Sequence, residues 1–113
     1  MRASDVRESL REIGLRPSRR RGQSFLLRES LARRIAEAAG GGSVLEVGPG
    51  LGALTRHLAE TAGRLCCVEI SGKLAGRLRG VAGLEDVEVV LADFLEVDPE
   101  ELPGHPFDVL ASN

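Results

Sequence analysis

The stretch Glu46-Val-Gly-Pro-Gly-Leu-Gly52 separates an apolar run from an amphipathic one and so predicts a glycine-rich turn between a strand and a helix. Glycine lets the backbone turn sharply and approach a ligand closely. Glu69 follows Gly48 by 21 residues and ends the next predicted strand. A carboxylate at that place can accept hydrogen bonds from both ribose hydroxyls of a nucleoside. Together the turn and Glu69 predict a site for an adenosine-containing cofactor.

Three details of the turn indicate which cofactor it binds. The dinucleotide fingerprint is G-x-G-x-x-G, whereas the third glycine here, Gly52, comes one residue early. Pro49 removes a backbone N–H from the turn, which makes the loop a poorer cradle for a pyrophosphate. Glu46 adds negative charge close to any phosphate. We therefore expect S-adenosylmethionine, which has no phosphate and carries a positive sulfonium and ammonium, with a nicotinamide dinucleotide as the alternative.

Strands and helices alternate on both sides of this turn, which predicts a parallel sheet wound by right-handed crossovers. The fold class is therefore α/β and Rossmann-like. The predicted strands are residues 43–47, 64–70, 87–91 and 107–111. The predicted helices are residues 5–13, 30–39, 51–62 and 71–79, with one helical turn at 98–102 and a loop over 15–27. In the helix over 30–39 we expect Leu31, Ile35 and Ala38 to face the core.

A complete doubly wound sheet has about six or seven strands, whereas only four are predicted here. We therefore expect the N-terminal part of a larger fold, with the C-terminal strands missing. In this arrangement Val109 and Leu110 lie on an open edge, where unpaired backbone groups promote aggregation.

The charge is unevenly distributed along the chain. Residues 1–34 carry ten arginines and four acids, a balance of +6, whereas the remainder carries five basic and thirteen acidic residues, a balance of −8. A basic arm on an acidic body indicates a polyanionic partner held by the arm. We divide the chain into a basic arm at 1–28 and a cofactor-binding domain at 29–113.

Composition narrows the class of protein further. A hydrophobic fraction of 42% with 28% charged residues is typical of soluble globular domains. We find no apolar run of roughly 18 to 20 residues and no signal peptide, and so expect no membrane partner. We also expect a monomer in the reducing cytoplasm, where free cysteines persist. Cys66 and Cys67 are adjacent, which suits neither a disulfide nor a zinc site. We therefore expect no metal.

Asp93 follows the third predicted strand as Glu69 follows the second. The carboxyl ends of parallel strands converge on one crevice, so the two side chains are expected at the same site. Asp93 is placed to accept a hydrogen bond from an adenine amino group, with Phe94 or Ile70 packing on the ring. An aspartate after a strand is also a common turn or helix-cap residue, and that alternative stays open.

Five sequence blocks occur in an order that resembles the rRNA adenine N6,N6-dimethyltransferase family, which includes small-subunit rRNA enzymes and the related erythromycin-resistance methylases. The most specific is the Gly-Gln-x-Phe-Leu element about 25 residues before the glycine turn. The blocks are Arg20-Arg-Gly-Gln-Ser-Phe-Leu26, Val44-Leu-Glu-Val-Gly-Pro-Gly-Leu-Gly-Ala-Leu-Thr55, Val68-Glu-Ile70, Ala92-Asp-Phe94 and Ser112-Asn113.

The resemblance implies a methyltransferase fold and a role for each matching residue toward S-adenosylmethionine. Gly48 and the neighbouring backbone line the methionine portion, Glu69 holds the ribose, and Asp93 holds the adenine beside Ile70 and Phe94. Glu46 and Gly50 are further cofactor-binding residues. The segment from Gln23 to Leu26 closes over the cofactor, and Leu26 contributes a contact. Ser24 stands where the family usually has asparagine. Its side chain is shorter and offers one hydroxyl in place of an amide, so we expect either a lost contact with weaker affinity or a contact bridged by water.

The resemblance also implies the reaction and its substrate. Asn113 matches the first residue of the family's catalytic motif, whose side chain accepts hydrogen bonds from the target N6 amino group and also lies at the cofactor. Arg16, Arg19, Arg20 and Arg21 are candidate rRNA contacts. The expected function is dimethylation of adenine N6 in small-subunit rRNA during ribosome maturation, a housekeeping rather than a resistance role, with the 113-residue piece itself inactive.

Three alternatives to this function stay open. One is a non-catalytic RNA-binding or ribosome-assembly factor that keeps the fold. Another is a methyltransferase that acts on a small molecule and does not need the arginine arm. The third is an oxidoreductase that binds NAD at the same turn.

Overall fold

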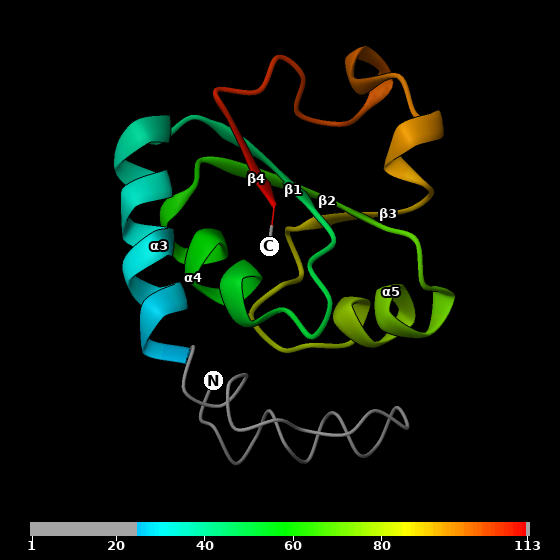
Figure 1. Ribbon diagram of the computed structural model, residues 1–113, viewed down its shortest axis with the longest axis horizontal. Helices are drawn as coiled ribbons and strands as arrows, with labels where there is room; N and C mark the ends of the chain where they lie inside the picture. The colour runs from blue at the N-terminus through cyan, green and yellow to red at the C-terminus, as the bar shows by residue number, and fades with distance from the viewer. Residues whose placement is uncertain (1–24, 113) are drawn as a thin grey trace.

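The computed structural model describes residues 25–112, which form a four-stranded, all-parallel sheet with helices (Figure 1). The strand order is β3-β2-β1-β4, with β1 and β2 in the centre. This confirms the predicted Rossmann-like α/β fold. The elements are α3 (Phe25–Ala39), β1 (Ser43–Val47), α4 (Ala53–Thr61), β2 (Arg64–Glu69), α5 (Gly72–Arg79), β3 (Glu88–Leu91), the short 3-10 helices η1 (Phe94–Glu96) and η2 (Pro99–Glu101), and β4 (Val109–Ser112).

The central strands are apolar on both faces, as expected of a parallel sheet that is covered on both sides. β1 and β2 run in register from Ser43 opposite Arg64 to Val47 opposite Val68. Because successive side chains alternate between faces, Cys66 and Cys67 enter two different cores. The core on the helical face contains Cys67 with Val44, Leu54, Leu58, Leu65 and Leu78. The core on the other face contains Cys66 with Leu45, Val68 and Leu102.

The helix α3 begins at Phe25, five residues earlier than predicted, so the loop prediction for residues 25–27 was wrong. Leucine, arginine and glutamate in this stretch favour a helix, and neither glycine nor proline interrupts it. The predicted buried face was also wrong for two residues. Ala32 and Ala39 are buried and Ile35 is half-buried, whereas Leu31 and Ala38 are exposed. The small side chains of Ala32 and Ala39 let α3 pack closely against α4, and this packing determines which face of α3 is buried.

The other predicted elements are confirmed with shifts of one to two residues at their ends. Ser71 caps α5 as predicted, since its hydroxyl accepts a hydrogen bond from the Leu74 N–H at 3.2 Å. Asp98 caps η2 in the same way. β4 begins at Val109 rather than at 107, because the Asp108 carboxylate accepts from the Ser43 N–H at 2.8 Å and so joins the loop to β1. Leu110 is exposed on β4, an edge strand of the described sheet, as expected.

Two features of the described residues bear on the class of protein. Within residues 25–112, no helix is both long and apolar enough to cross a membrane. Both cysteines are free thiols and are buried. The predicted helix over 5–13 and most of the predicted loop over 15–27 lie outside the described residues.

The turns at the amino ends of β1 and β2 approach each other closely at Gly63. Its N–H donates to the Gly42 carbonyl at 2.9 Å, and a Cβ on Gly63 would collide with the Gly41 carbonyl oxygen. Gly76 in α5 is a matched contrast, since a Cβ there would meet nothing within 4 Å.

We predict that Gly63→Ala lowers the free energy of unfolding by roughly 1–3 kcal/mol, because backbone must move to admit the methyl group. Gly76→Ala should raise it by about 0.5–1 kcal/mol, since alanine loses less entropy in a helix. Urea unfolding of the two variants beside the unmutated chain measures both effects. Equal effects of the two substitutions would contradict the close approach at Gly63.

The buried thiols predict a specific dependence of stability on pH. Burial raises the pKa of Cys66 to about 11, an effect that Glu88 increases and Arg64 opposes. Burial also raises the pKa of Cys67, and the Glu46 carboxylate adds to the rise. A group whose pKa is raised by folding stabilises the folded state below its unfolded pKa and loses that contribution as the pH rises through its folded pKa.

We therefore expect the melting temperature to fall as the pH rises from about 9 to about 11. The fall should be smaller in Cys66→Ala, which removes one of the titrating groups. Thermal unfolding followed by circular dichroism across this range is the measurement. An identical pH profile for the variant and the unmutated chain would show that Cys66 does not stay protonated in the fold.

Candidate cofactor-binding site

A pocket of about 240 Å³ opens at the carboxyl ends of β1, β2 and β3. Figure 1 shows these three strands side by side, ending at the same edge of the sheet. Nine residues line the pocket, and five of them were predicted from the sequence as site residues. The predicted five are Gly48, Glu69, Ile70, Asp93 and Phe94, and the other four are Val47, Val68, Ala92 and Leu95. The lining is mostly apolar with two carboxylates, which suits an uncharged purine ring and a ribose.

The glycine turn leaves β1 in a conformation that only glycine adopts readily. The φ angles of Gly48 and Gly50 are 71° and 59°, in the left-handed region. A Cβ at either position would meet nothing within 4 Å, so the space beside the turn is open. The requirement for glycine here therefore comes from the backbone conformation and not from a neighbouring side chain.

Most backbone N–H groups of the turn already donate within the protein. Gly48 donates to the Val68 carbonyl at 2.9 Å, Gly50 to the Glu69 carboxylate at 3.0 Å, and Gly52 to the Pro49 carbonyl at 3.0 Å. Proline has no N–H to offer. A pyrophosphate cradle needs such donors directed at the ligand. The turn is therefore built for a cofactor without a pyrophosphate, as its sequence predicted.

The Glu69 carboxylate joins the turn to the rest of the site. It is 4% exposed, and its two oxygens accept hydrogen bonds from the backbone N–H groups of Gly50 at 3.0 Å and Ser71 at 2.9 Å. An ionised carboxylate has about four acceptor positions, so each oxygen can accept one further hydrogen bond from a ligand. Sequence reasoning placed this carboxylate at the end of β2 but did not predict its bonds to the backbone.

Asp93 and its neighbours form the wall of the pocket beyond β3. The Asp93 carboxylate accepts from the Leu95 N–H at 3.0 Å and so caps η1, which is the alternative role considered for this residue. It lines the pocket as well, so capping and ligand binding are compatible. Ile70 and Leu95 are 67% and 91% exposed, an unusual degree for large apolar side chains. They form an apolar rim around the opening.

Glu46 lies apart from this pocket. Its side chain is 0% exposed on the helical face of the sheet, where its Oε1 accepts from the Thr55 hydroxyl at 2.6 Å and from the Cys67 thiol at 3.4 Å. It is absent from the residues that line the pocket. The predicted direct contact of Glu46 with the cofactor is therefore not supported by its position in this structure.

Among the remaining predicted site residues, Leu26 is the one that the structure describes. Leu26 falls in the first turn of α3. The others lie outside the described residues, and their roles stay predictions: Gln23, Ser24 and Asn113 for the cofactor and the target base, and Arg16, Arg19, Arg20 and Arg21 for RNA.

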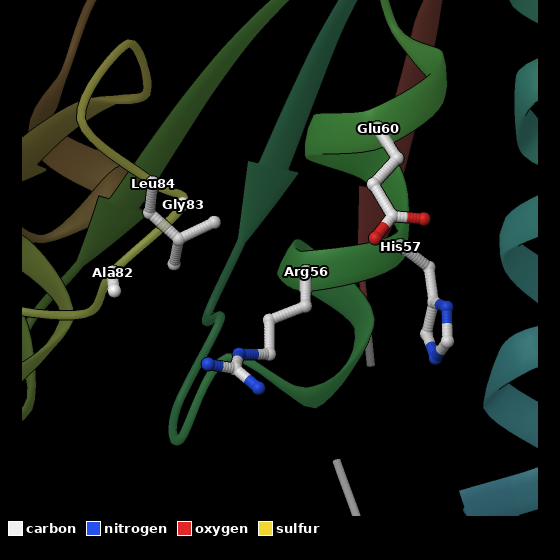
Figure 2. Close-up of a pocket in the computed structure, with 6 residues that line it drawn as sticks. All are labelled: Arg56, His57, Glu60, Ala82, Gly83 and Leu84. Carbon is white, nitrogen blue, oxygen red and sulfur yellow. The ribbon is translucent and has the colours of Figure 1, made fainter.

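A second hollow, which sequence reasoning did not predict, lies between α4 and the loop after α5. It has a volume of about 330 Å³ and is lined by Arg56, His57 and Glu60 from α4 and by residues 82–84 (Figure 2). Figure 2 shows the Arg56 and His57 side chains pointing away from each other. They do not converge on a common point, so we assign this hollow no ligand. Among residues 25–112, no group of three or more histidine, cysteine or acidic side chains is arranged to hold a metal ion.

Comparison with known proteins gives a family and a consistent fold. The model of the family described as ribosomal RNA adenine dimethylase matches residues 15–112. Ribosomal RNA small subunit methyltransferase A of Rhodococcus opacus is 40% identical over 118 residues, covering 96% of this chain and 40% of that protein. The protein of the same name from Moorella thermoacetica is 44% identical over 97 residues, covering 82% and 34%. The chain thus spans well under half the length of these relatives.

Solved structures agree with this grouping. The 23S rRNA methyltransferase ErmE shares 41% identity and a TM-score of 0.58, covering 74% of this chain and 34% of that one. A dimethyladenosine transferase from Plasmodium falciparum shares 26% identity and a TM-score of 0.57, covering 74% and 31%. Streptomyces venezuelae DesVI, at 20% identity and a TM-score of 0.65, supports the fold alone. With a family model that matches nearly its whole length, the chain belongs to the ribosomal RNA adenine dimethylase family.

Proposed function

We propose that the protein transfers methyl groups from S-adenosylmethionine to N6 of adenines in rRNA, forming dimethyladenosine in the small ribosomal subunit. The observation that carries this proposal is the pocket at the carboxyl edge of the sheet, where the glycine turn and Glu69 are hydrogen-bonded in a chain of the rRNA adenine dimethylase family. Such a role would place the protein in the cytoplasm, where ribosomes mature.

The donor pattern of the turn favours S-adenosylmethionine over NAD. The three glycine N–H groups are engaged within the protein and Pro49 has none, so a pyrophosphate would meet few donors. Glu69 and Asp93 add negative charge at the same pocket, which disfavours a phosphate and favours a cofactor with positive groups. Both features favour S-adenosylmethionine over the NAD alternative at this site.

The described residues divide the binding of this cofactor among them. Glu69 accepts hydrogen bonds from the ribose hydroxyls, and Asp93 accepts one from the adenine amino group. Ile70 and Phe94 pack on the ring, and the backbone at Gly48 lines the methionine portion. When bound, the cofactor supplies an electrophilic methyl group on its sulfonium.

Beyond the residues that line the pocket, the reaction rests on three further assignments. Asn113 accepts hydrogen bonds from the target N6 amino group and so directs its lone pair toward the methyl group, which makes positioning the main source of the rate. The segment from Gln23 to Leu26 closes over the cofactor. Arg16, Arg19, Arg20 and Arg21 contact rRNA phosphates, as the basic balance of the arm suggests.

Cofactor choice is tested by calorimetry on the unmutated chain and on Glu69→Gln. We expect S-adenosylmethionine to bind and NAD not to bind. A glutamine has one oxygen and one NH₂ group, so it cannot accept from both the Gly50 and Ser71 N–H groups. The loss of a hydrogen bond to a charged group, about 1.5–3 kcal/mol, should weaken S-adenosylmethionine roughly 10- to 100-fold.

The exposed glutamate on β3 provides the matched control for this experiment. Glu88→Gln makes the same chemical change away from the pocket and should leave the affinity unchanged. Heat from NAD together with none from S-adenosylmethionine would contradict the proposal.

The reaction is tested in a protein of the relatives' length that carries this sequence. Small-subunit rRNA incubated with it and S-adenosylmethionine should gain dimethyladenosine by mass spectrometry, and Asn113→Ala should abolish the gain. Changing Arg19, Arg20 and Arg21 to glutamine should weaken rRNA binding. The slope of the logarithm of the binding constant against the logarithm of the salt concentration should become shallower by roughly 0.7–0.9 per lost phosphate contact. Methyl transfer to a small molecule that is unaffected by the arginine changes would instead favour the small-molecule alternative.

A further inference from the structure

Three buried polar side chains meet beneath the glycine turn. The Glu46 carboxylate on β1 accepts hydrogen bonds at one oxygen, Oε1, from the Thr55 hydroxyl on α4 at 2.6 Å and from the Cys67 thiol on β2 at 3.4 Å. All three side chains are 0% exposed. The network therefore joins the first two strands and the helix between them at one atom.

Stability alone does not explain a carboxylate at this place. The surrounding core on the helical face is apolar, with Val44, Leu54, Leu58 and Leu65 close by. Removing a carboxylate from water is costly even when it is hydrogen-bonded, and apolar residues of similar volume often replace such groups without loss of stability. A buried network of this kind is better explained by the geometry that it imposes.

Each member of the network lies two or three residues from either a pocket residue or the glycine turn. Glu46 precedes Gly48 by two residues on β1, and Cys67 precedes Glu69 by two on β2, on the same face of the sheet. Glu46 and Cys67 are partners in the register of the two strands. Thr55 lies in the first turn of α4, just after Gly52 ends the glycine turn. The network thus links the two strands that lead into the Gly50–Glu69 hydrogen bond and the helix that follows the turn.

We propose that Glu46 and Thr55 are positioning residues that set the distance between the glycine turn and Glu69, and so shape the part of the pocket that receives the methionine portion of the cofactor. This inference rests on the proposed function. It replaces the direct contact expected of Glu46 with an indirect role, and it assigns a role to the hydroxyl of Thr55, which lies away from the pocket lining.

The test compares two ligands on variants of the full chain. Thr55→Val keeps the shape of the side chain but removes the hydroxyl donor, whereas Thr55→Ser keeps the donor. We expect Thr55→Val to weaken S-adenosylmethionine about tenfold or more. Its effect on 5′-methylthioadenosine should be much smaller, because that ligand lacks the amino acid portion that the turn receives. Thr55→Ser should restore both affinities.

Thr61 provides a matched control at the other end of α4. Its hydroxyl donates to the His57 carbonyl at 3.0 Å, so Thr61→Val makes the same chemical change on the same helix, away from the turn. It should leave both affinities unchanged. Urea unfolding of each variant shows whether it folds, and if Thr55→Val does not, Cys67→Ala beside Cys67→Ser repeats the comparison from β2.

The outcomes separate this inference from the proposed function. A selective loss for S-adenosylmethionine that serine rescues supports the positioning role. Equal losses for the two ligands, no loss at all, or a serine variant that behaves like valine would overturn it while leaving the proposed function intact. Failure of the unmutated chain to bind S-adenosylmethionine would overturn both.

Discussion

The site depends on the Glu69 carboxylate, which accepts hydrogen bonds from two backbone N–H groups. One N–H belongs to Gly50 in the turn after β1, and the other to Ser71 at the start of α5. A single side chain thus ties together the turn, the end of β2 and the next helix. Because the carboxylate is almost fully buried, these bonds are sheltered from competing water and are worth more than they would be at the surface. The shape of the pocket follows from them.

Two carboxylates near the turn therefore have different roles. Glu69 lies in the pocket with capacity for ligand hydrogen bonds, whereas Glu46 lies below it and holds α4 and β2. In the sequence after α5, residues 85–112 carry nine acidic residues and neither lysine nor arginine. A polyanion is repelled from that part of the surface.

The sequence predicted the sheet, its parallel winding and five of the residues that line the pocket, because glycine spacing and strand-end carboxylates follow from local chemistry. It did not predict the start of α3 or its buried face, since the packing of Ala32 and Ala39 against α4 is tertiary and outweighs the local pattern. The sequence likewise does not show which face of the sheet the Glu46 side chain joins. A residue before a turn can face either side of the sheet, and only the strand register shows which.

The most direct test of this account is a crystal structure of the chain with S-adenosylhomocysteine, the demethylated form of the cofactor. We expect the ribose hydroxyls within hydrogen-bond distance of Glu69, and the adenine between Ile70 and Phe94 with its amino group toward Asp93. The Glu46 carboxylate should remain on Thr55 and Cys67 without touching the ligand. A ligand bound instead in the hollow beside Arg56 and residues 82–84, or a Glu69 carboxylate that makes no contact with it, would contradict the account.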